Sequence, residues 1–352
     1  MKIKNLMRLL GALISLTLVA AACGSTASEI AEEATDAVDG DDDEAMEDEE
    51  AMEDDEAMED NSHSDLSVAI VAPSASDDVA FTQSMIDSLS RLGVTPQVTD
   101  GTFVVEEAAA AIRAFAEDGT NVIIAHGTQY GGSLEEIAPE FPETSFIWGT
   151  SADNLGLDNV FAYFPAADQG GYVNGLIAGS LADGGQIGVV GPVEAGDAVA
   201  YINGFTLGAE SVGASTSVVY TGSFSDVALA TTTAQAHADN GVVAMTGTSQ
   251  SAVGAVNIAT ANDLPWFGTQ SNTEPWSSDL TVASQVYHWD VVLSDMFAMI
   301  EEGTLGGEVF EITLENGGLV MEYNDAFALD ADIRAAADAA VEGIIAGDIA
   351  TQ

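Results

Sequence analysis

The chain has 352 residues, and its 58 acidic residues against six lysines and arginines give a formal net charge of −52 at pH 7. Because a surface that follows nucleic-acid phosphates needs clustered Lys and Arg, this composition excludes nucleic acid as a partner. The single cysteine, Cys23, has no second cysteine with which to form a disulfide. A folded domain of this chain must therefore be stabilised by its core alone.

The first 22 residues have the pattern of a lipoprotein signal peptide. Basic residues precede an apolar run over 9–22, which is shorter than the roughly 20 residues that cross a bilayer as a helix. The stretch "AAACG" over 20–24 resembles a bacterial lipobox, in which the cysteine is acylated. We expect Cys23 to carry the lipid that anchors the protein at the extracytoplasmic face of the cell membrane. A buried or reactive free cysteine is the alternative.

An acidic segment follows the lipobox. Residues 24–65 contain 20 Asp or Glu and no apolar period, and a six-residue unit repeats within "EAMEDEEAMEDDEAMED". Like charges at this density repel one another and keep a chain extended. We interpret 23–65 as the lipidated cysteine and a disordered tether. A weak Ca²⁺-binding or partner-binding tail is the alternative, although the spaced ligands of a defined calcium loop are missing.

From residue 66 onward, short runs rich in β-branched residues alternate with longer amphipathic segments. The short runs favour buried strands, at 66–72, 121–126, 144–149, 186–191, 216–222 and 241–247. The amphipathic segments favour helices, among them 79–93, 105–119, 169–185 and 226–241. This alternation predicts an α/β fold with parallel sheets that are covered by helices on both faces.

The strand and helix units are too many for one sheet, and the pattern is interrupted around 158–168. We therefore predict two doubly wound parallel-sheet lobes joined by a hinge. The first lobe is expected over 66–165 and 290–312, and the second over 166–289 and 313–340. The chain would cross between them near 163–168, 286–291 and 310–325. Ligands of such folds bind in a cleft at the carboxyl ends of the strands.

The part of the chain that is expected to fold is itself strongly acidic. It carries 38 acidic residues against three arginines, a net charge of about −35. Salt must screen this repulsion for the domain to be stable. We therefore infer a saline habitat.

The loops that follow the predicted strands are rich in aromatic, hydroxyl and amide side chains and poor in charge. They include "APSASDDVAFTQS", "AHGTQYGGS", "TGSFSD", "TGTSQSAVG", "FGTQSN" and "SQVYHWD". Such residues hold a neutral planar ligand by stacking and hydrogen bonding.

Several of these segments resemble the basic membrane protein family, the lipoprotein substrate-binding components of ABC transporters, many of which bind nucleosides or purine bases. "DDVAFTQS", "QGGYVNGLIAG" and "YTGSFSD" are similar to the family patterns D-D-x-x-F-N-Q-S, Q-G-S-Y-L-A-G-x-x-A-G and Y-x-G-S-F-S-D. The resemblance extends over about 66–323. It implies a type I periplasmic-binding-protein fold and a monomer that delivers a small molecule to an ABC permease.

The residues that contact ribose in the family's nucleoside binders are missing. Those proteins carry an Asp in a G-V-D-S-D loop and a Lys in an S-V-V-K-R strand. Here the loop reads "GTQSN", with Gln270 in place of the Asp, and no lysine follows Lys4. "SQVYHWD" instead resembles the S-T-V-W-N-W-G strand of a second branch of the family. We therefore expect a purine base or another neutral heterocycle rather than an intact nucleoside, with sugars or other polar solutes as alternatives.

The resemblance implies that Phe81 and Phe224 stack on opposite faces of one flat ring. The other residues expected to bind the ligand are Asp78, Thr82, Gln129, Tyr130, Thr248, Gln270, Tyr287, His288 and Trp289. The residues alone allow another role for each of these side chains. Phe81 and Phe224 would be core aromatics, Trp289 would pack at the hinge, and Asp78 would cap the helix that follows it. These alternatives stay open at this point.

Metal sites and catalytic motifs find little support in the sequence. His126 and His288 are a candidate metal pair, but the chain has four histidines and no H-x-x-x-H pattern, so neither a metal nor a cofactor is expected. No G-x-G-x-x-G, Walker or G-x-S-x-G motif follows a predicted strand, and we predict that the protein is not an enzyme. A lipoprotein that senses a ligand for a membrane receptor remains the alternative to transport.

Overall fold

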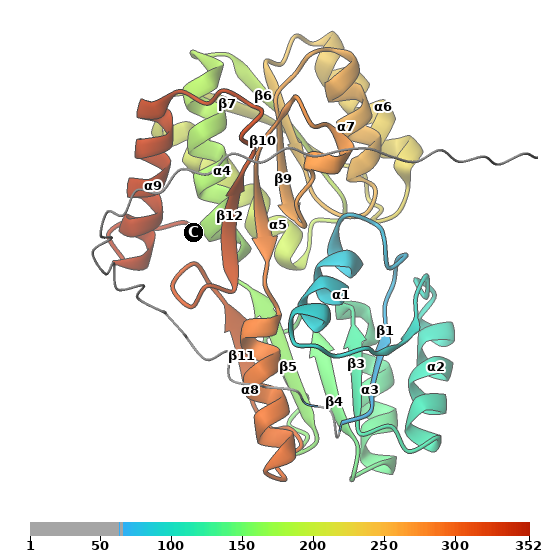
Figure 1. Cartoon of the computed structure of the whole chain (residues 1–352). Coiled ribbons are helices and arrows are strands. Elements are labelled where there is room, and N and C mark those ends of the chain that lie inside the picture. The colour runs from blue at the N-terminus through green and yellow to red at the C-terminus, as the bar shows by residue number, and fades with distance from the viewer. Residues whose placement is uncertain (1–62, 64–65) are drawn as a thin grey trace, which may run out of the picture. The chain divides into compact units, whose positions relative to one another are not determined.

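The computed structural model describes residue 63 and residues 66–352. The predicted signal peptide, the lipidated Cys23 and nearly all of the acidic tether lie outside the described residues. The described part contains two sheets of six strands each, with helices on both faces of each sheet (Figure 1). The α/β fold with two sheets that the sequence predicts is confirmed.

The first sheet has the strand order β11-β5-β4-β3-β1-β2, and all of its pairs are parallel. Its strands are β1 Val68–Val71, β2 Gln97–Thr99, β3 Val122–His126, β4 Ser145–Gly149, β5 Val160–Pro165 and β11 Val309–Ile312. The sequence suggests an interruption where β5 lies. The structure instead has strand β5 there, and five of the six residues of "VFAYFP" are buried in the sheet. The chain leaves the first sheet only after β5 ends.

The second sheet has the order β12-β10-β9-β8-β6-β7. Its strands are β6 Gln186–Gly191, β7 Ser215–Tyr220, β8 Ala244–Gly247, β9 Trp266–Gln270, β10 Thr281–Tyr287 and β12 Leu319–Tyr323. Strand β12 pairs antiparallel with β10, whereas the other pairs are parallel. The strand order reverses between β1 and β3 in the first sheet and between β6 and β8 in the second, and ligands bind at such switch points in open α/β sheets.

Strand residues alternate between the helices on the two faces of each sheet. In β3, Val122 and Ile124 belong to the core cluster with α1 and α8, while Ile123 and Ala125 pack with α2 and α3. In the second sheet, α4 and α5 cover one face and α6 and α7 the other. The α-helices are α1 Phe81–Arg91, α2 Val105–Glu117, α3 Gly131–Ile137, α4 Ala167–Ala182, α5 Gly196–Ser211, α6 Val227–Asp239, α7 Ala252–Ala261, α8 Asp290–Glu301 and α9 Ala331–Ile345. The 3₁₀ turns are η1 Thr128–Tyr130, η2 Ala138–Glu140 and η3 Glu274–Trp276.

Three connections carry the chain from one sheet to the other. They run from β5 to α4, from β10 to α8 and from β11 to β12. Helix α8 packs against α1 and β11 of the first sheet, where Arg91 Nε donates to Asp290 Oδ1 at 2.8 Å. Among the described residues, no helix has the length and hydropathy of a membrane span.

Glycines allow α4 and α5 to pack backbone against backbone. An added methyl group would overlap a main-chain carbonyl of the facing helix at four positions. These are Gly171 and Gly175 of α4, and Gly204 and Gly208 of α5. Gly171 and Gly175 within "QGGYVNGLIAG" therefore serve this close contact between two helices, whereas Gly170 faces the Gln285 side chain of β10. Sequence patterns assign α4 correctly as a helix but give no reason for its glycines.

Replacing Gly175 by Ala is expected to lower the free energy of unfolding by about 1–3 kcal/mol or more, because the added methyl group meets the backbone of Phe205, which has no rotamer to change. Urea unfolding monitored by circular dichroism measures the loss. Gly132→Ala on α3 is the matched control, since nothing lies within 4 Å of its added Cβ. That control is expected to leave stability unchanged or to raise it by up to about 1 kcal/mol. Equal effects of the two substitutions would contradict the packing argument.

The three arginines of the described part all pair with carboxylates. Arg91 pairs with Asp290, Arg113 with Glu140 and Arg334 with Asp338. These exposed pairs leave most of the 38 acidic residues after position 65 without a cation.

We expect the melting temperature to rise as sodium chloride is raised from tens of millimolar to molar concentration, because screening weakens repulsion that unfolding would relieve. Differential scanning calorimetry measures the rise. Potassium chloride at matched ionic strength should have the same effect, since screening depends on charge and not on the ion. A melting temperature that stays flat over this range would rule out the inference of a saline habitat.

Candidate functional site

A pocket of about 250 Å³ lies where the carboxyl-end loops of the two sheets meet. From the first sheet it is lined by Pro73, Phe81, Phe103, Gly127, Thr128, Gln129 and Thr150. From the second sheet it is lined by Ala195, Gly196, Asp197, Ala198, Phe224, Thr248, Ser249, Gln250 and Gln270. Most of these residues follow β1, β3, β6 or β8, the strands on either side of the two switch points, so the pocket occupies the position at which such folds bind ligands. Ligand pockets usually measure about 300–1,000 Å³, so this one suits a compact solute.

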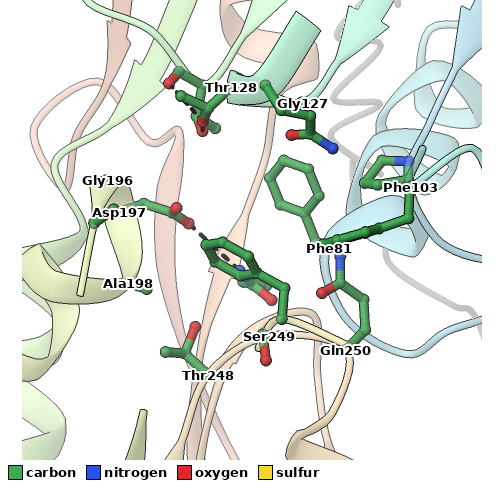
Figure 2. A pocket seen from close by; sticks show the side chains of 16 residues that line it. Phe81, Phe103, Gly127, Thr128, Gly196, Asp197, Ala198, Thr248, Ser249 and Gln250 are labelled. Carbon is green, nitrogen blue, oxygen red and sulfur yellow. Dashed lines mark hydrogen bonds between the residues drawn. The ribbon is translucent and has the colours of Figure 1, made fainter. Parts of the chain in front are cut away.

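Three phenylalanine rings form the apolar part of the pocket. Phe81 is the first residue of α1 and is 7% exposed, whereas Phe103, in the loop after β2, is 41% exposed. Phe103 and Phe224, which lie in loops of different sheets, have ring centroids 6.5 Å apart at an interplanar angle of 51°, so the two rings approach each other without stacking. Figure 2 shows Phe81 and Phe103 on one side of the pocket and Asp197 on the other.

The His126 imidazole stacks on one face of the Phe81 ring. The two rings stack with centroids 3.9 Å apart and an interplanar angle of 9°. His126 Nε2 lies 3.0 Å from the Phe81 carbonyl oxygen, and Nδ1 lies at hydrogen-bond distance from the Tyr163 hydroxyl. Because a carbonyl can only accept, Nε2 carries the proton and Nδ1 accepts from Tyr163. Burial lowers the pKa of His126 to about 3, so the imidazole is neutral at physiological pH.

The polar end of the pocket centres on Asp197, the one ionisable group among the residues that line it in the described part. Asp197 lies in the first turn of α5. Its Oδ2 is 3.4 Å from Gln270 Nε2 and 3.4 Å from the Tyr287 hydroxyl. Burial raises the pKa of the Asp197 carboxyl, and the hydrogen bonds from Gln270 and Tyr287 partly offset that rise. The pocket therefore combines apolar ring faces with one carboxylate and several uncharged polar groups.

Metal-binding geometry is not found in the part of the chain that the structure describes. No group of three or more His, Cys, Asp or Glu side chains there is placed to hold an ion. His126, one member of the candidate pair, has both ring nitrogens engaged with Phe81 and Tyr163.

Residues 66–345 match the protein family described as ABC transporter substrate-binding protein, PnrA-like. The chain belongs to this family. The resemblance inferred from the sequence is thereby confirmed, and so is the prediction that the protein is not an enzyme, since the family consists of substrate-binding proteins. As a PnrA-like ABC transporter solute-binding protein, the chain binds a small solute, and an extracytoplasmic position is typical of such proteins.

Individual relatives agree with this assignment. A purine-binding protein of Brucella abortus is 28% identical over 200 residues, which is 56% of this chain and 56% of the relative. The match thus spans little more than half of that relative's length. A solute-binding protein of an ABC transporter system from Conexibacter woesei has a TM-score of 0.69 at 25% identity, covering 81% of this chain and 98% of the other. An ABC solute-binding protein from Aeropyrum pernix has a TM-score of 0.70 at 18% identity, covering 81% and 92%, and supports the fold alone.

In this PnrA-like protein, five of the residues expected to bind ligand line the pocket. They are Phe81, Gln129, Phe224, Thr248 and Gln270. Phe81 and Phe224 come from the loops of different sheets, and one face of Phe81 is already covered by His126. Gln270 ends β9 and adopts a left-handed backbone with φ of 77°, which is uncommon for a residue other than glycine.

Asp78 and Thr82 lie beside the pocket, at the start of α1. The Asp78 carboxylate accepts hydrogen bonds from the backbone N–H groups of Ala80, Thr82 and Gln83 at 2.9, 3.2 and 3.0 Å, as a helix cap does. Burial raises the Asp78 pKa, and its hydrogen bonds partly offset the rise. The buried Thr82 hydroxyl lies 2.7 Å from Ser74 Oγ. Both residues thus fix the position of the α1 N-terminus and hence of Phe81.

The remaining expected residues also lie outside the pocket lining. The Tyr130 hydroxyl donates to the Thr102 carbonyl at 2.9 Å, and Trp289 Nε1 donates to Ser84 Oγ at 2.9 Å, so both side chains are buried structural groups. Tyr287 reaches the site only through its hydroxyl at Asp197. His288 is partly buried, and its backbone N–H donates to the Gly318 carbonyl at 2.8 Å, beside the connection into β12.

Sequence reasoning missed Phe103 and Asp197. Phe103 follows β2, a three-residue strand that has no apolar pattern of its own, so the sequence gives no sign that its loop lies at the carboxyl edge of the sheet. Asp197 follows the strand predicted at 186–191, and the position of "GPVEAGDAV" after that strand is a signal that could have identified it.

Proposed function

We propose that the protein binds a purine base, a purine nucleoside or a similar neutral heterocycle and delivers it to an ABC permease. The observation that carries the proposal is the set of three phenylalanine rings around a compact pocket, with Phe81 held flat by the stacked His126. Stacking on an aromatic ring contributes roughly 1–3 kcal/mol per base. The similarity to a purine-binding protein of Brucella abortus supports the same ligand class.

The charge of the pocket is consistent with this proposal. Nucleotides and other phosphorylated solutes need cations or clustered N–H donors, and no Lys, Arg or His lines the pocket in the described part. The amide and hydroxyl groups of Gln129, Thr248 and Gln270 instead suit the ring edge of an uncharged heterocycle.

Mass spectrometry of the small molecule released by denaturing freshly purified protein tests this proposal. A protein that retains its natural ligand should release a purine base or nucleoside in near-stoichiometric amount. Release of a sugar or an amino acid from well-folded protein would contradict it.

We propose further that two lobes, 66–165 with 290–312 and 166–289 with 313–340, close on the ligand by bending at the three connections between the sheets. Small-angle scattering should show a more compact particle with ligand than without, and superimposable profiles would argue against closure.

We also propose that the mature chain begins at Cys23 and is held at the outer face of the cell membrane by acylation. A mass of the N-terminal peptide that lacks the acyl chains would refute this anchor.

A further inference from the structure

The polar end of the pocket contains one buried acceptor that no described protein group satisfies, and a carboxyl group whose side-chain hydrogen bonds are long. Gln270 is 4% exposed, and its Oε1 has no hydrogen-bond partner among the described residues. The two hydrogen bonds to Asp197 Oδ2, from Gln270 and Tyr287, are both 3.4 Å long, whereas good N–H···O and O–H···O bonds measure about 2.5–3.2 Å. A buried acceptor without a donor is costly, and natural structures avoid it. Gln270 Oε1 therefore points to a donor that comes from outside the chain, and the long bonds to Asp197 Oδ2 leave this carboxyl able to accept from the same group.

The backbone at Gln270 supports the same conclusion. Its φ of 77° places a non-glycine residue in the left-handed region at the last position of β9. Such strained residues persist only where the surroundings hold them, and they cluster at ligand-binding sites. Gln270 lines the same pocket as Asp197 and Phe81.

The charge of Asp197 adds a second requirement on the ligand. No basic side chain lines the pocket in the described part, so a cation of the protein does not neutralise this carboxylate there. Gln270 replaces the carboxylate that the family's nucleoside binders carry at this position, and the fold supplies another carboxyl from the first turn of α5.

We propose that Asp197 and Gln270 form a subsite for a hydrogen-bond-donating group of the ligand, and that Asp197 is the residue that selects for it. This inference rests on the proposed function and deepens it. In a purine ligand the donor has two sources, the hydroxyls of an attached sugar or the amino and ring N–H groups of the base. Both present O–H or N–H to the carboxylate and leave the ring face to Phe81.

Titration calorimetry with two sets of probes distinguishes these sources. The sugar set compares adenosine with 9-(tetrahydrofuran-2-yl)adenine, which keeps the sugar ring and lacks all of its hydroxyls. The base set compares adenine with unsubstituted purine, which lacks the amino group, and with 9-methyladenine, which lacks the ring N–H at that position. Each pair is measured on the wild-type protein, on Asp197→Asn and on Asp197→Ala. Glu210→Gln is the matched control, because Glu210 is an exposed acid on the same helix and outside the pocket.

Asp197→Ala is expected to weaken binding of the probe that carries the donor about 10- to 100-fold, with a smaller loss for Asp197→Asn, which keeps one acceptor. For the probe without the donor, the dissociation constants of wild type and Asp197→Ala should agree within about threefold. Removing the ligand donor already breaks the interaction, so removing the carboxyl as well has little further effect. Coupling within the sugar set assigns the subsite to sugar hydroxyls, and coupling within the base set assigns it to the base. Glu210→Gln should behave as wild type with every probe.

Two results would overturn the inference in distinguishable ways. If wild type binds a probe and Asp197→Ala binds both members of each pair with unchanged preference, the subsite is wrong and the proposed function stands. If wild-type protein of native circular dichroism binds none of the five probes, the proposed function fails and the inference fails with it.

Discussion

Replacing Phe81 by Ala is expected to weaken binding of a purine about 5- to 150-fold, the range that corresponds to losing one base–aromatic stack of roughly 1–3 kcal/mol. Phe81 offers one face to the pocket while its other face lies on His126, 3.9 Å away. The ring is therefore pre-positioned, and ordering it costs the complex little. Phe81→Leu keeps much of the apolar volume but removes the flat ring, so it should lose most of the same affinity. Isothermal titration calorimetry of both variants measures the loss.

A matched control separates loss of stacking from loss of stability. Phe115 lies on α2, packs partly buried in the core of the first sheet and does not line the pocket. Phe115→Ala should lower the melting temperature without changing the dissociation constant for the same purine. Wild-type affinity in both Phe81 variants would show that the ring packs in the core and does not stack on the ligand.

Between pH 6.5 and pH 4.5, His126 is expected to cost wild type about 2–3 kcal/mol of its free energy of unfolding. His126→Gln should not show this part of the loss. Burial lowers the pKa of folded His126 to about 3, while in the unfolded chain its pKa lies near 6.5, the ordinary value for histidine. Between those values only the unfolded state binds the proton, so this group favours unfolding increasingly as the pH falls below 6.5. Its contribution to stability is therefore fully present above pH 6.5 and is lost toward pH 3.

Urea unfolding of wild type and His126→Gln at several pH values measures this difference. The comparison is needed because protonation of the many carboxylates also changes stability as the pH falls, and that effect is common to both proteins. Tyr163→Phe, which removes the hydroxyl at His126 Nδ1 and keeps the imidazole, should retain the wild-type pH dependence. Parallel pH profiles for wild type and His126→Gln would mean that His126 is protonated in the folded protein.

The sequence predicts the fold well where strands are buried and β-branched. Each of the six runs chosen for their apolar character corresponds to a strand, β1, β3, β4, β6, β7 or β8. Two of the other six strands show why a local apolar pattern is not sufficient to identify a strand. Strand β2 is three residues long and mostly exposed, and β12 joins the second sheet antiparallel at its edge, where only one neighbour holds it. Pairing across the sheet, which no local pattern encodes, determines these elements.

The site was predictable in its location and only partly in its members. Loops after strands of parallel sheets meet at one edge, and this rule places Phe81, Phe224 and Gln270 in the pocket. The same rule cannot say which way a side chain turns. Trp289 and Tyr130, which neighbour the site in sequence, are instead directed into the core. Asp197 reaches the pocket because α5 begins at its edge, which depends on how α5 packs against α4.

Calorimetric titration of wild-type protein with purine bases, purine nucleosides and a panel of neutral sugars tests the proposed ligand most directly. At least one purine should bind with a dissociation constant below roughly 100 μM, which corresponds to about −5.5 kcal/mol, and more tightly than every sugar in the panel. Binding of a sugar in that range, with no heat from adenine, guanine, hypoxanthine, adenosine or inosine, would contradict the assignment of this pocket to purines.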